Sequence, residues 1–525
     1  MTEKTSDAGS APLTRRNFLE QFGLVGGSTL VMSAMRSWDL MAQAGPRPVL
    51  SGRPNGTKVV VLGAGVSGLA VAYELGKLGY SVRVLEARER VGGVNWTLRR
   101  GSTHTELGPG GETQVCNFDE GLYHNGGPWR LPYWHTGVLG YCKELGVPLE
   151  VFVNENESSY FYYEGDNIGP LAGKRVRLRE VKADMIGYTC ELMAKAIDQT
   201  ALDVPLTAED KERFVTFLVT EGYLDSADRA YKKTSARGPG DPHDFRALLQ
   251  SGFGNRIRSV IEGTGMAPMF QPAGGMDQFP KAFQRKLGDA ITLGVEVTSI
   301  RQSADGVKVA YRNTKTGAMT EVSADYCVSC LPLTILSRLD VNLSPETMAA
   351  VKATPYSPSA KMGLQMRRRF WEEDDSIFGG HLYSNLPFGN FSYPSWGYFG
   401  NKGILLGFYG NGQMSGVVNM PVKERVEHVL THASKVHPQI RAEYETAYCT
   451  FWEKIPYSMG AFAGGGGGGS PTSRLAVLNK PDNRIFIGCA AISGNGGWQE
   501  GAVAAAWKQV KQLHELVMTT RRTAA

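Results

Sequence analysis

The glycines at positions 63, 65 and 68 have the G-x-G-x-x-G spacing of a loop that binds a dinucleotide. Gly63 would allow a tight turn, Gly65 would let backbone N–H groups approach a pyrophosphate, and Gly68 would let helix and strand pack closely. Glu86 follows about 20 residues later, where a carboxylate accepts hydrogen bonds from ribose hydroxyls. A carboxylate there disfavours a phosphorylated ribose.

The segments around these glycines have the pattern of a strand, a helix and a second strand. Residues 58–62 form an apolar run, typical of a strand buried on both faces of a parallel sheet. Residues 66–78 carry apolar side chains at helical spacing, and Gly79 follows as a common helix end. Residues 81–85 form the second strand, which ends at Glu86. This order predicts a βαβ unit of a doubly wound α/β fold.

A second glycine pair follows Glu86 after a short charged segment. The positions that form this pattern are Glu86, Arg90, Gly92, Gly93, Thr97 and Gly101. Together with the first loop they resemble the flavin amine oxidase family, which includes monoamine oxidases, polyamine oxidases and L-amino acid oxidases. The resemblance extends through Gly274-Gly275-Met276 to residues 496–502, nearly the whole chain after the N-terminal segment. It implies FAD, rather than NAD, as the cofactor.

The resemblance also implies which residues bind FAD. Residues 106–108 resemble an element that precedes the flavin, Val297 lies in a strand whose backbone would hold the adenine, and residues 496–502 resemble the C-terminal flavin motif. Val94 and Cys489 depart from the family, which usually has an Arg and an acidic residue there. Each departure would remove one polar contact to FAD. The implied FAD-binding residues are Gly63, Gly65, Gly68, Glu86, Arg88, Gly92, Gly93, Gly108, Arg130, Val297, Gly488 and Trp498.

The cysteines predict neither covalent flavin nor a metal site. Residues 458–462 resemble the segment that carries the flavin-linked Cys of monoamine oxidases, but Ala461 occupies that position. We therefore expect non-covalent FAD. Cys327 and Cys330 form a C-x-x-C inside an apolar run with no second pair to complete a metal site. Core packing is favoured for them over redox or metal chemistry.

Arg130 is the residue that most strongly indicates a substrate. It lies in Gly127-Pro128-Trp129-Arg130-Leu131-Pro132, followed by His135. This segment resembles that of L-amino acid oxidases, in which the Arg binds the substrate carboxylate. A planar guanidinium suits that task because it binds a carboxylate through two parallel hydrogen bonds. The alternative for Arg130 is a structural ion pair, and His135 could be either structural or a substrate contact.

Four further side chains are implied to complete the catalytic site together with Arg130. Lys361 resembles the lysine that holds a water near the flavin N5, and Tyr409, or its neighbour Phe408, resembles a second carboxylate partner. Phe462 and Trp498 fall where amine oxidases place two aromatic side chains beside the amine. Apolar aromatic walls would exclude water and favour the neutral amine. Solvation of the lysine and core packing of the aromatics are the alternatives.

The sequence therefore predicts oxidative deamination of an L-amino acid by hydride transfer to flavin. The products would be a 2-oxo acid, ammonia and hydrogen peroxide, with oxygen as the second substrate. The aromatic surroundings favour a large apolar or aromatic amino acid. An amino-acid 2-monooxygenase, a monoamine oxidase and a non-catalytic flavoprotein remain alternatives, and the oligomeric state stays open, with a homodimer as one expectation.

The N-terminal segment has the features of an export signal. Arg15-Arg16 lies in a twin-arginine pattern, an apolar run from 22 to 35 follows, and Ala42-Gln43-Ala44 offers a cleavage site. The run is shorter than the roughly 20 residues that span a bilayer. We expect residues 1–44 to be a twin-arginine signal peptide, and the mature protein to be periplasmic or secreted without a membrane anchor. The formal net charge of +5 is spread along the chain and indicates no nucleic-acid partner.

The chain length of 525 residues suits several domains. We expect a discontinuous, doubly wound FAD-binding domain formed by 55–135, 265–340 and 481–520. A helical subdomain would span 136–264, and a substrate domain with a mixed sheet would span 341–480. The six glycines at 464–469 predict a flexible loop.

Overall fold

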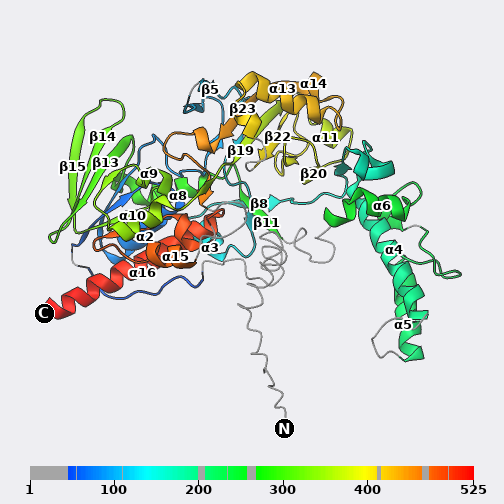
Figure 1. Ribbon diagram of the computed structural model, residues 1–525, viewed down its shortest axis with the longest axis horizontal. Helices are drawn as coiled ribbons and strands as arrows, with labels where there is room; N and C mark the ends of the chain where they lie inside the picture. Colours follow the sequence, from blue (N-terminus) through cyan, green and yellow to red (C-terminus); the bar gives the residue numbers. More distant parts are fainter. Residues whose placement is uncertain are drawn as a thin grey trace, which may run out of the picture.

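A parallel sheet of five strands forms the core of one half of the molecule (Figure 1). The computed structural model describes residues 45–524 apart from 55, 109, 199–206, 233, 257–267, 411–414, 464–471 and 495. The strand order is β12-β2-β1-β16-β25, and every neighbouring pair is parallel. This order confirms the doubly wound fold. The strands are β1 (Lys58–Leu62), β2 (Ser81–Leu85), β12 (Ile291–Thr292), β16 (Tyr326–Ser329) and β25 (Ile485–Ile487).

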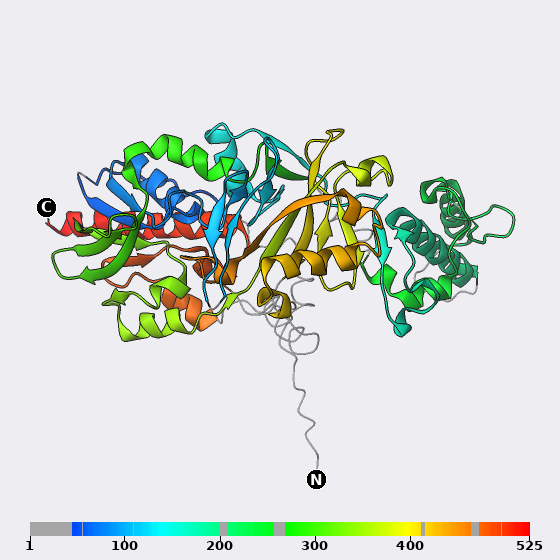
Figure 2. The ribbon, with the colours of Figure 1, turned by 90° about the horizontal axis from the view of Figure 1, so that it is seen from above.

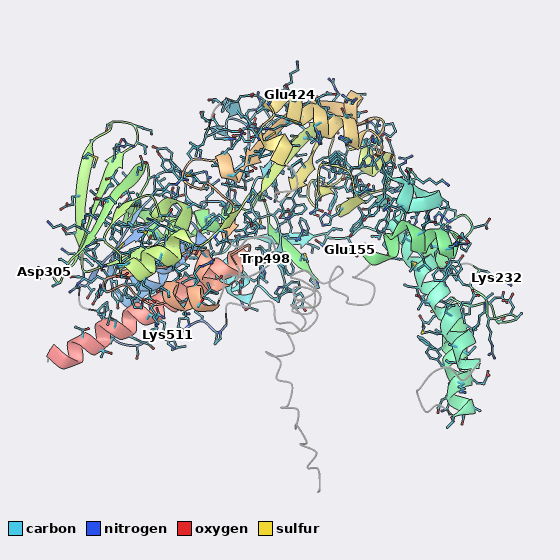
Figure 3. The ribbon with its side chains drawn as sticks, viewed as in Figure 1. Glu155, Lys232, Asp305, Glu424, Trp498 and Lys511 are labelled. Carbon is cyan, nitrogen blue, oxygen red and sulfur yellow. The ribbon has the colours of Figure 1, made fainter. Side chains whose placement is uncertain are left out.

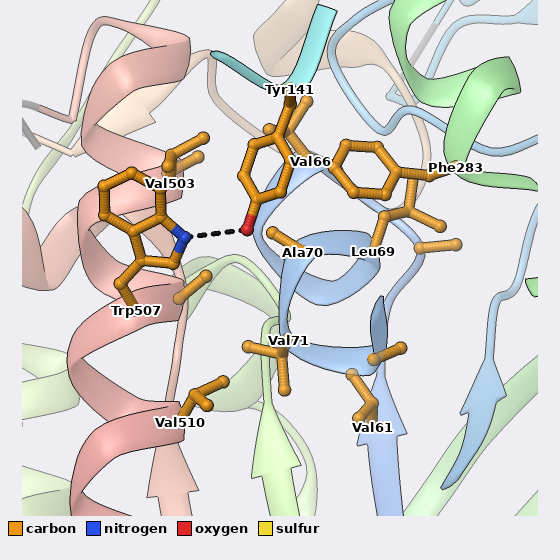
Figure 4. Packing of buried hydrophobic residues seen from close by; sticks show 14 of the residues in the cluster. Val61, Val66, Leu69, Ala70, Val71, Tyr141, Phe283, Val503, Trp507 and Val510 are labelled. Carbon is orange, nitrogen blue, oxygen red and sulfur yellow. Dashed lines mark hydrogen bonds between the residues drawn. The ribbon is translucent and has the colours of Figure 1, made fainter. Parts of the chain in front are cut away.

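Three helices cover one face of this sheet. They are α2 (Val66–Leu78), α8 (Gln278–Leu287) and α16 (Gln499–Ala524). Figure 4 shows Leu69 and Val71 of α2 packed between Val61 and the side chains Phe283 and Trp507. The helix α2 ends at Gly79 in the left-handed conformation, as its sequence predicts. A helix, a strand and a later helix thus share one buried apolar cluster.

A second sheet, antiparallel except for the parallel pair β13 and β17, covers the opposite face. Its strands are β15 (Met319–Ala324), β14 (Val307–Asn313), β13 (Val295–Gln302) and β17 (Asp340–Val341). Val60 and Leu62 of β1 pack there against Val297 and Val309. The sequence predicts one strand over 321–331, but the chain leaves one sheet and enters another at Asp325. Asp325 turns the chain because its carboxylate accepts the backbone N–H of Lys58 at 2.7 Å, which starts the pairing of β16 with β1.

The second half of the molecule contains a mixed sheet of seven strands. Its order is β10-β9-β20-β21-β22-β19-β23, in which β20 and β9 are parallel and the other pairs are antiparallel. The helix α13 (Val422–Ala433) packs on this sheet. The expected mixed-sheet substrate part is thus present. Its strands are β9 (Tyr160–Tyr162), β10 (Val176–Arg177), β19 (Ala360–Met366), β20 (His381–Ser384), β21 (Phe391–Ser392), β22 (Gly403–Gly410) and β23 (Tyr444–Phe451).

A helical arm projects from the substrate side (Figures 1 and 2). It contains α4 (Leu178–Asp198), α5 (Ala208–Thr220) and α6 (Phe245–Ser251). The interval 136–264 is less helical than the sequence predicts, because β9 and β10 form the edge of the substrate sheet and β8 (Leu149–Phe152) joins a small sheet. The aromatic run of β9 has no helical spacing and is buried by partners far away in sequence.

Short elements connect the two halves. They are β3 (Thr97–Leu98), β4 (Thr103–Thr105), β5 (Thr113–Val115), β6 (His124–Asn125), β7 (Leu131–Pro132), α3 (Thr136–Glu144), β11 (Met269–Pro272), β18 (Tyr356–Ser357) and β24 (Phe462–Ala463). Within the described ranges, no helix is long and apolar enough to cross a membrane. The same residues contain no group of three or more His, Cys, Asp or Glu placed to hold a metal ion. The expected signal peptide and the glycine run lie outside the described residues.

Candidate flavin and substrate site

The loop between β1 and α2 has the geometry of an anion-binding loop. Gly63 has φ of 92°, and a Cβ at Gly68 would collide with the carbonyl oxygen of Gly63. A Cβ at Gly65 would meet no atom within 4 Å, so space remains in front of this glycine. No side chain caps the N-terminus of α2. Its first N–H groups and its partial positive charge are therefore directed toward a ligand, as a pyrophosphate requires.

Glu86 lies beside this loop and is buried. Its carboxylate accepts the backbone N–H groups of Ala64 at 2.8 Å and Arg88 at 2.9 Å. Its carbonyl oxygen accepts the N–H of Val295 at 2.9 Å, which places β13, and with it Val297, next to the ribose end of the loop. Glu86, the strand that carries Val297 and the glycine loop thus lie close together.

The second glycine pair contacts the first loop. Gly92 donates its N–H to the carbonyl of Ala64 at 2.7 Å, and a Cβ at Gly93 would lie 3.3 Å from the Cα of Gly65. Arg88 extends toward the other half of the chain, where its guanidinium donates to the Pro456 carbonyl at 2.6 Å and to Ser458 at 2.8 Å. Burial lowers the pKa of Arg88. Arg88 is therefore engaged in joining two segments around the loop.

Gly108 does not join this group. It lies exposed in the loop that connects β4 and β5, beside β23 of the substrate sheet. Glu106 in the same loop forms a buried ion pair with Arg425, with oxygen–nitrogen distances of 2.5 and 2.9 Å. The Glu-x-Gly run thus forms the loop of a hairpin whose carboxylate pairs with the helix α13. The pair holds the pKa of Glu106 below its usual range, against the effect of burial.

At the end of β25 the chain returns to the glycine loop. The Ser67 hydroxyl donates to the carbonyl of Gly488, and a Cβ at Gly488 would lie 2.9 Å from the Cys330 sulfur. Gly488 therefore needs to be glycine for packing. Cys489 is buried, and burial raises the pKa of its thiol to about 11, so this residue presents a neutral thiol at the end of β25.

Gly127 belongs to the site, although it is not among the predicted site residues. A Cβ there would collide with the carbonyl oxygen of Val94, so the segment carrying Arg130 lies directly on the chain that follows the second glycine pair. The ammonium of Lys361 donates to the Gly127 carbonyl. The available signal was the Gly-Gly-Pro sequence, since paired glycines mark close backbone approach. Gly127 connects the cofactor loop, Arg130 and Lys361.

The structure brings Arg130 and Trp498 together from opposite ends of the chain. The guanidinium carbon of Arg130 lies 5.9 Å from the ring centre of Trp498 and 5.2 Å from that of Trp129. Trp498 occupies the middle of the molecule in Figure 3. Both distances lie within the range of about 6 Å in which a guanidinium is attracted to an aromatic ring.

Lys361 and Tyr409 are direct cross-strand neighbours on β19 and β22. Their side chains therefore share one face of the sheet, and the ammonium lies 4.7 Å from the Tyr409 ring and 4.9 Å from the Trp129 ring. Lys361 is 3% exposed. Burial, together with the positive charge of Arg130, holds the pKa of Lys361 well below its usual value. The site thus contains a fixed guanidinium next to an amine that releases its proton easily.

His135 and Glu500 fix the position of the Trp498 segment. The His135 ring meets the Trp498 ring edge to face at 4.9 Å, and burial followed by the charge of Arg130 lowers the pKa of His135 to about 4. Glu500, which lies in the 496–502 motif but is not among the predicted site residues, accepts the N–H groups of Gly137 and Val138 at 2.8 and 2.9 Å. Its carboxylate therefore holds the N-terminus of α3 against α16. The sequence signal for this role was an acidic residue two positions after Trp498.

Phe462 lies on the other side of this segment. It belongs to β24, which pairs with β18, and its ring lies 3.8 Å from where a Cβ of Gly497 would be. Gly497 precedes Trp498, so the two aromatic residues flank the same turn. The predicted catalytic residues form one connected group. Arg130 contacts Trp498 and Trp129, and Lys361 contacts Trp129 and Tyr409. Phe462 is connected to Trp498 through Gly497.

Comparisons with known proteins identify the family of this chain. Residues 66–514 match the model of the flavin-containing amine oxidoreductases. An L-amino-acid oxidase of Echis ocellatus is 27% identical over 502 residues, which cover 88% of this chain and 90% of that protein. An L-amino-acid oxidase of Siganus canaliculatus is 28% identical over 421 residues, covering 77% and 75%.

A solved structure shares the fold. Putrescine oxidase bound to putrescine is 19% identical with a TM-score of 0.57, and the match covers 87% of this chain and 99% of that one. The open space before Gly65, the uncapped helix and the carboxylate of Glu86 fit the pyrophosphate and ribose of a dinucleotide. The chain belongs to the family of flavin-containing amine oxidoreductases, and its cofactor is FAD.

Proposed function

We propose that this protein oxidises L-amino acids to 2-oxo acids, with release of ammonia and hydrogen peroxide. The observation that carries the proposal is the position of Arg130, stacked near Trp498 and next to the buried Lys361. A substrate carboxylate at this guanidinium would lie beside the segment implied to contact the flavin. Simple amines have no carboxylate to use it. The relatives named L-amino-acid oxidases support the same substrate class.

Each side chain of the site has a separate role in the proposed reaction. Arg130 binds the carboxylate through two parallel hydrogen bonds, and the Tyr409 hydroxyl donates a third. Trp498 and Phe462 exclude water from the amine and hold it in its neutral form. FAD, when bound, supplies the hydride acceptor, and oxygen takes up the electrons as hydrogen peroxide. Lys361 holds a water molecule through its amine while Gly127 fixes the position of that amine.

The test is a panel of the twenty L-amino acids with ammonia and peroxide measured per turnover. We expect equal amounts of both. Arg130→Met should lower kcat/KM for the best substrate by about 100-fold or more, because a charge-assisted bidentate pair is lost. Arg130→Lys should recover only part of this, because an ammonium lacks the fork.

The matched control is Arg213→Met on the exposed face of α5, which should leave kcat/KM unchanged. An amide and carbon dioxide in place of ammonia and peroxide would identify a 2-monooxygenase. Oxidation of decarboxylated amines with no effect of Arg130→Met would identify a monoamine oxidase. A protein that binds FAD but turns over neither class would be a non-catalytic flavoprotein.

We also propose that FAD is held without a covalent bond, and that the protein is exported. Ala461 offers no sulfur to the flavin, so acid precipitation should release all the yellow colour into the supernatant. The Arg15-Arg16 pattern supports export of the folded, FAD-loaded protein by the twin-arginine route to the periplasm or beyond.

A further inference from the structure

Beside the predicted carboxylate anchor lies a half-open cavity. Trp129 forms one wall, and the rest comes from residues of β6, β8, β11, β21 and β22, from Tyr123 and from the segment 393–396 that follows β21. The same Trp129 ring contacts the anchor: the Arg130 guanidinium carbon lies 5.2 Å from the Trp129 ring centre and the Lys361 ammonium 4.9 Å. The cavity and the predicted anchor therefore share Trp129, which places the cavity within reach of a substrate held at Arg130.

Aromatic rings dominate the lining. Phe152 meets Trp129 edge to face at 5.2 Å, and Tyr123 stacks on Trp396 at 4.0 Å with an angle of 9° between the ring planes. Such pairs form flat, rigid walls that suit another ring. The described residues that line the cavity include no Asp, Glu, Lys or Arg. His124, which also lines it, is held neutral because burial and the charge of Lys361 lower its pKa to about 3.

Two buried amides give the cavity a polar end. The Gln271 side chain donates to Glu150 at 2.8 Å and to the Ser395 carbonyl at 3.3 Å. These bonds use its amide hydrogens, so its oxygen is the group that Gln271 can offer a ligand. The oxygen of Asn125 accepts from Thr97 and from the Met276 N–H, so its amide hydrogens are the complementary group.

We propose that this cavity binds the side chain of a neutral aromatic amino acid with a hydroxyl at its end, as in L-tyrosine. A phenol both donates and accepts a hydrogen bond, which matches the oxygen of Gln271 and the amide hydrogens of Asn125. A charged side chain is disfavoured because the lining offers it no opposite charge and burial would remove its water. Glu150 lies behind Gln271, and burial raises its pKa, which weakens it as a partner for a cation. The inference rests on the proposed function and names its substrate class.

The FAD-loaded protein tests this in two ways. We expect kcat/KM for L-tyrosine to exceed that for L-phenylalanine by about 10-fold, the worth of one to two buried hydrogen bonds. Two carboxylates without an amine, 3-(4-hydroxyphenyl)propanoate and 3-phenylpropanoate, should show the same order in their dissociation constants, measured by calorimetry. This comparison needs no variant and no turnover.

Gln271→Leu and Gln271→Met remove the acceptor while keeping the volume. In either variant the tyrosine rate should fall by about 10-fold and the phenylalanine rate should change little, so that the preference disappears. Gln250→Leu, at an exposed position on α6, is the matched control and should keep the preference.

The outcomes separate the two proposals. Oxidation of L-amino acids with equal rates for tyrosine and phenylalanine, with a preference for L-lysine, or with a preference that survives loss of Gln271 overturns the cavity assignment and leaves the proposed function standing. A protein that binds neither carboxylate and oxidises no L-amino acid overturns the proposed function, and the cavity assignment with it.

Discussion

At the scale of single residues, Gly65 and Gly68 meet two different requirements of the same loop: open space in front of Gly65 and close backbone packing at Gly68. Gly68→Ala should destabilise the FAD-free protein by about 1–3 kcal/mol, because its Cβ meets the Gly63 carbonyl and the backbone must shift. Gly65→Ala has space for its methyl group and should keep the melting temperature of the FAD-free protein, but should weaken FAD binding because the methyl occupies the approach of the pyrophosphate. Thermal melting and FAD titration of both variants measure this difference, and equal effects on stability would contradict it.

The buried amine of Lys361 gives a dependence of stability on pH. Its pKa is lowered in the folded protein, so the unfolded chain binds more protons between that pKa and the usual value near 10.5. In this window the stability contributed by position 361 rises with pH, by about 1.4 kcal/mol per pH unit. Lys361→Met should therefore melt at a higher temperature than wild type near neutral pH, and the gap should narrow toward pH 10. A gap that does not change with pH would contradict the assignment.

The sequence predicts those site residues that carry their signal locally. Gly63, Gly65, Gly68 and Glu86 are recognisable because a phosphate-binding turn needs fixed spacing within one βαβ unit. The pairing of Glu106, two residues before Gly108, has no local signal because its partner Arg425 on α13 follows 319 residues later. Glu500 lies inside the 496–502 motif, but its role is not predicted because the helix that it caps begins 363 residues earlier in the chain.

At the scale of elements, the contact between α16 and α3 determines the distance from Trp498 to Arg130. Glu500→Ala removes the acceptor for two N–H groups at the start of α3 and should cost about 1–3 kcal/mol. It should also raise KM for the amino acid, because α3 follows the Arg130 segment directly. The exposed Glu515→Ala on the same helix is the control and should change neither quantity. Thermal melting and steady-state kinetics of the two variants measure the changes in stability and KM. A normal KM in Glu500→Ala would contradict the predicted role of this contact.

Elements with a strong local pattern were predicted closely, and those defined by distant partners were not. The bounds of α2 and of β1 and β2 match because their apolar spacing and the glycine at the helix end are local. The strands β9 and β10 lie where a helical subdomain was expected, since only their pairing with β20 makes them part of a sheet.

At the scale of the whole molecule, the proposed export requires a protein that folds before it crosses the membrane. A change of Arg15-Arg16 to Lys-Lys should leave the FAD-loaded protein in the cytoplasm, because the transporter recognises the twin-arginine pair of the signal peptide. Cell fractionation with a flavin absorbance measurement on each fraction tests this. If the Lys-Lys variant still appeared outside the cytoplasm as a colourless protein without FAD, export would use a different route.

The strand β25 and the helix α16 complete both the parallel sheet and the aromatic wall at Trp498, yet they follow every other described element in the chain. On the ribosome they are therefore made after Arg130, Lys361 and the glycine loop. A nascent chain that already contains the proposed carboxylate anchor still lacks the strand beside β16 and the indole of Trp498, which is proposed to flank the amine. Under the proposed function, synthesis itself delays the first turnover, and the translating cell meets no peroxide from unfinished copies.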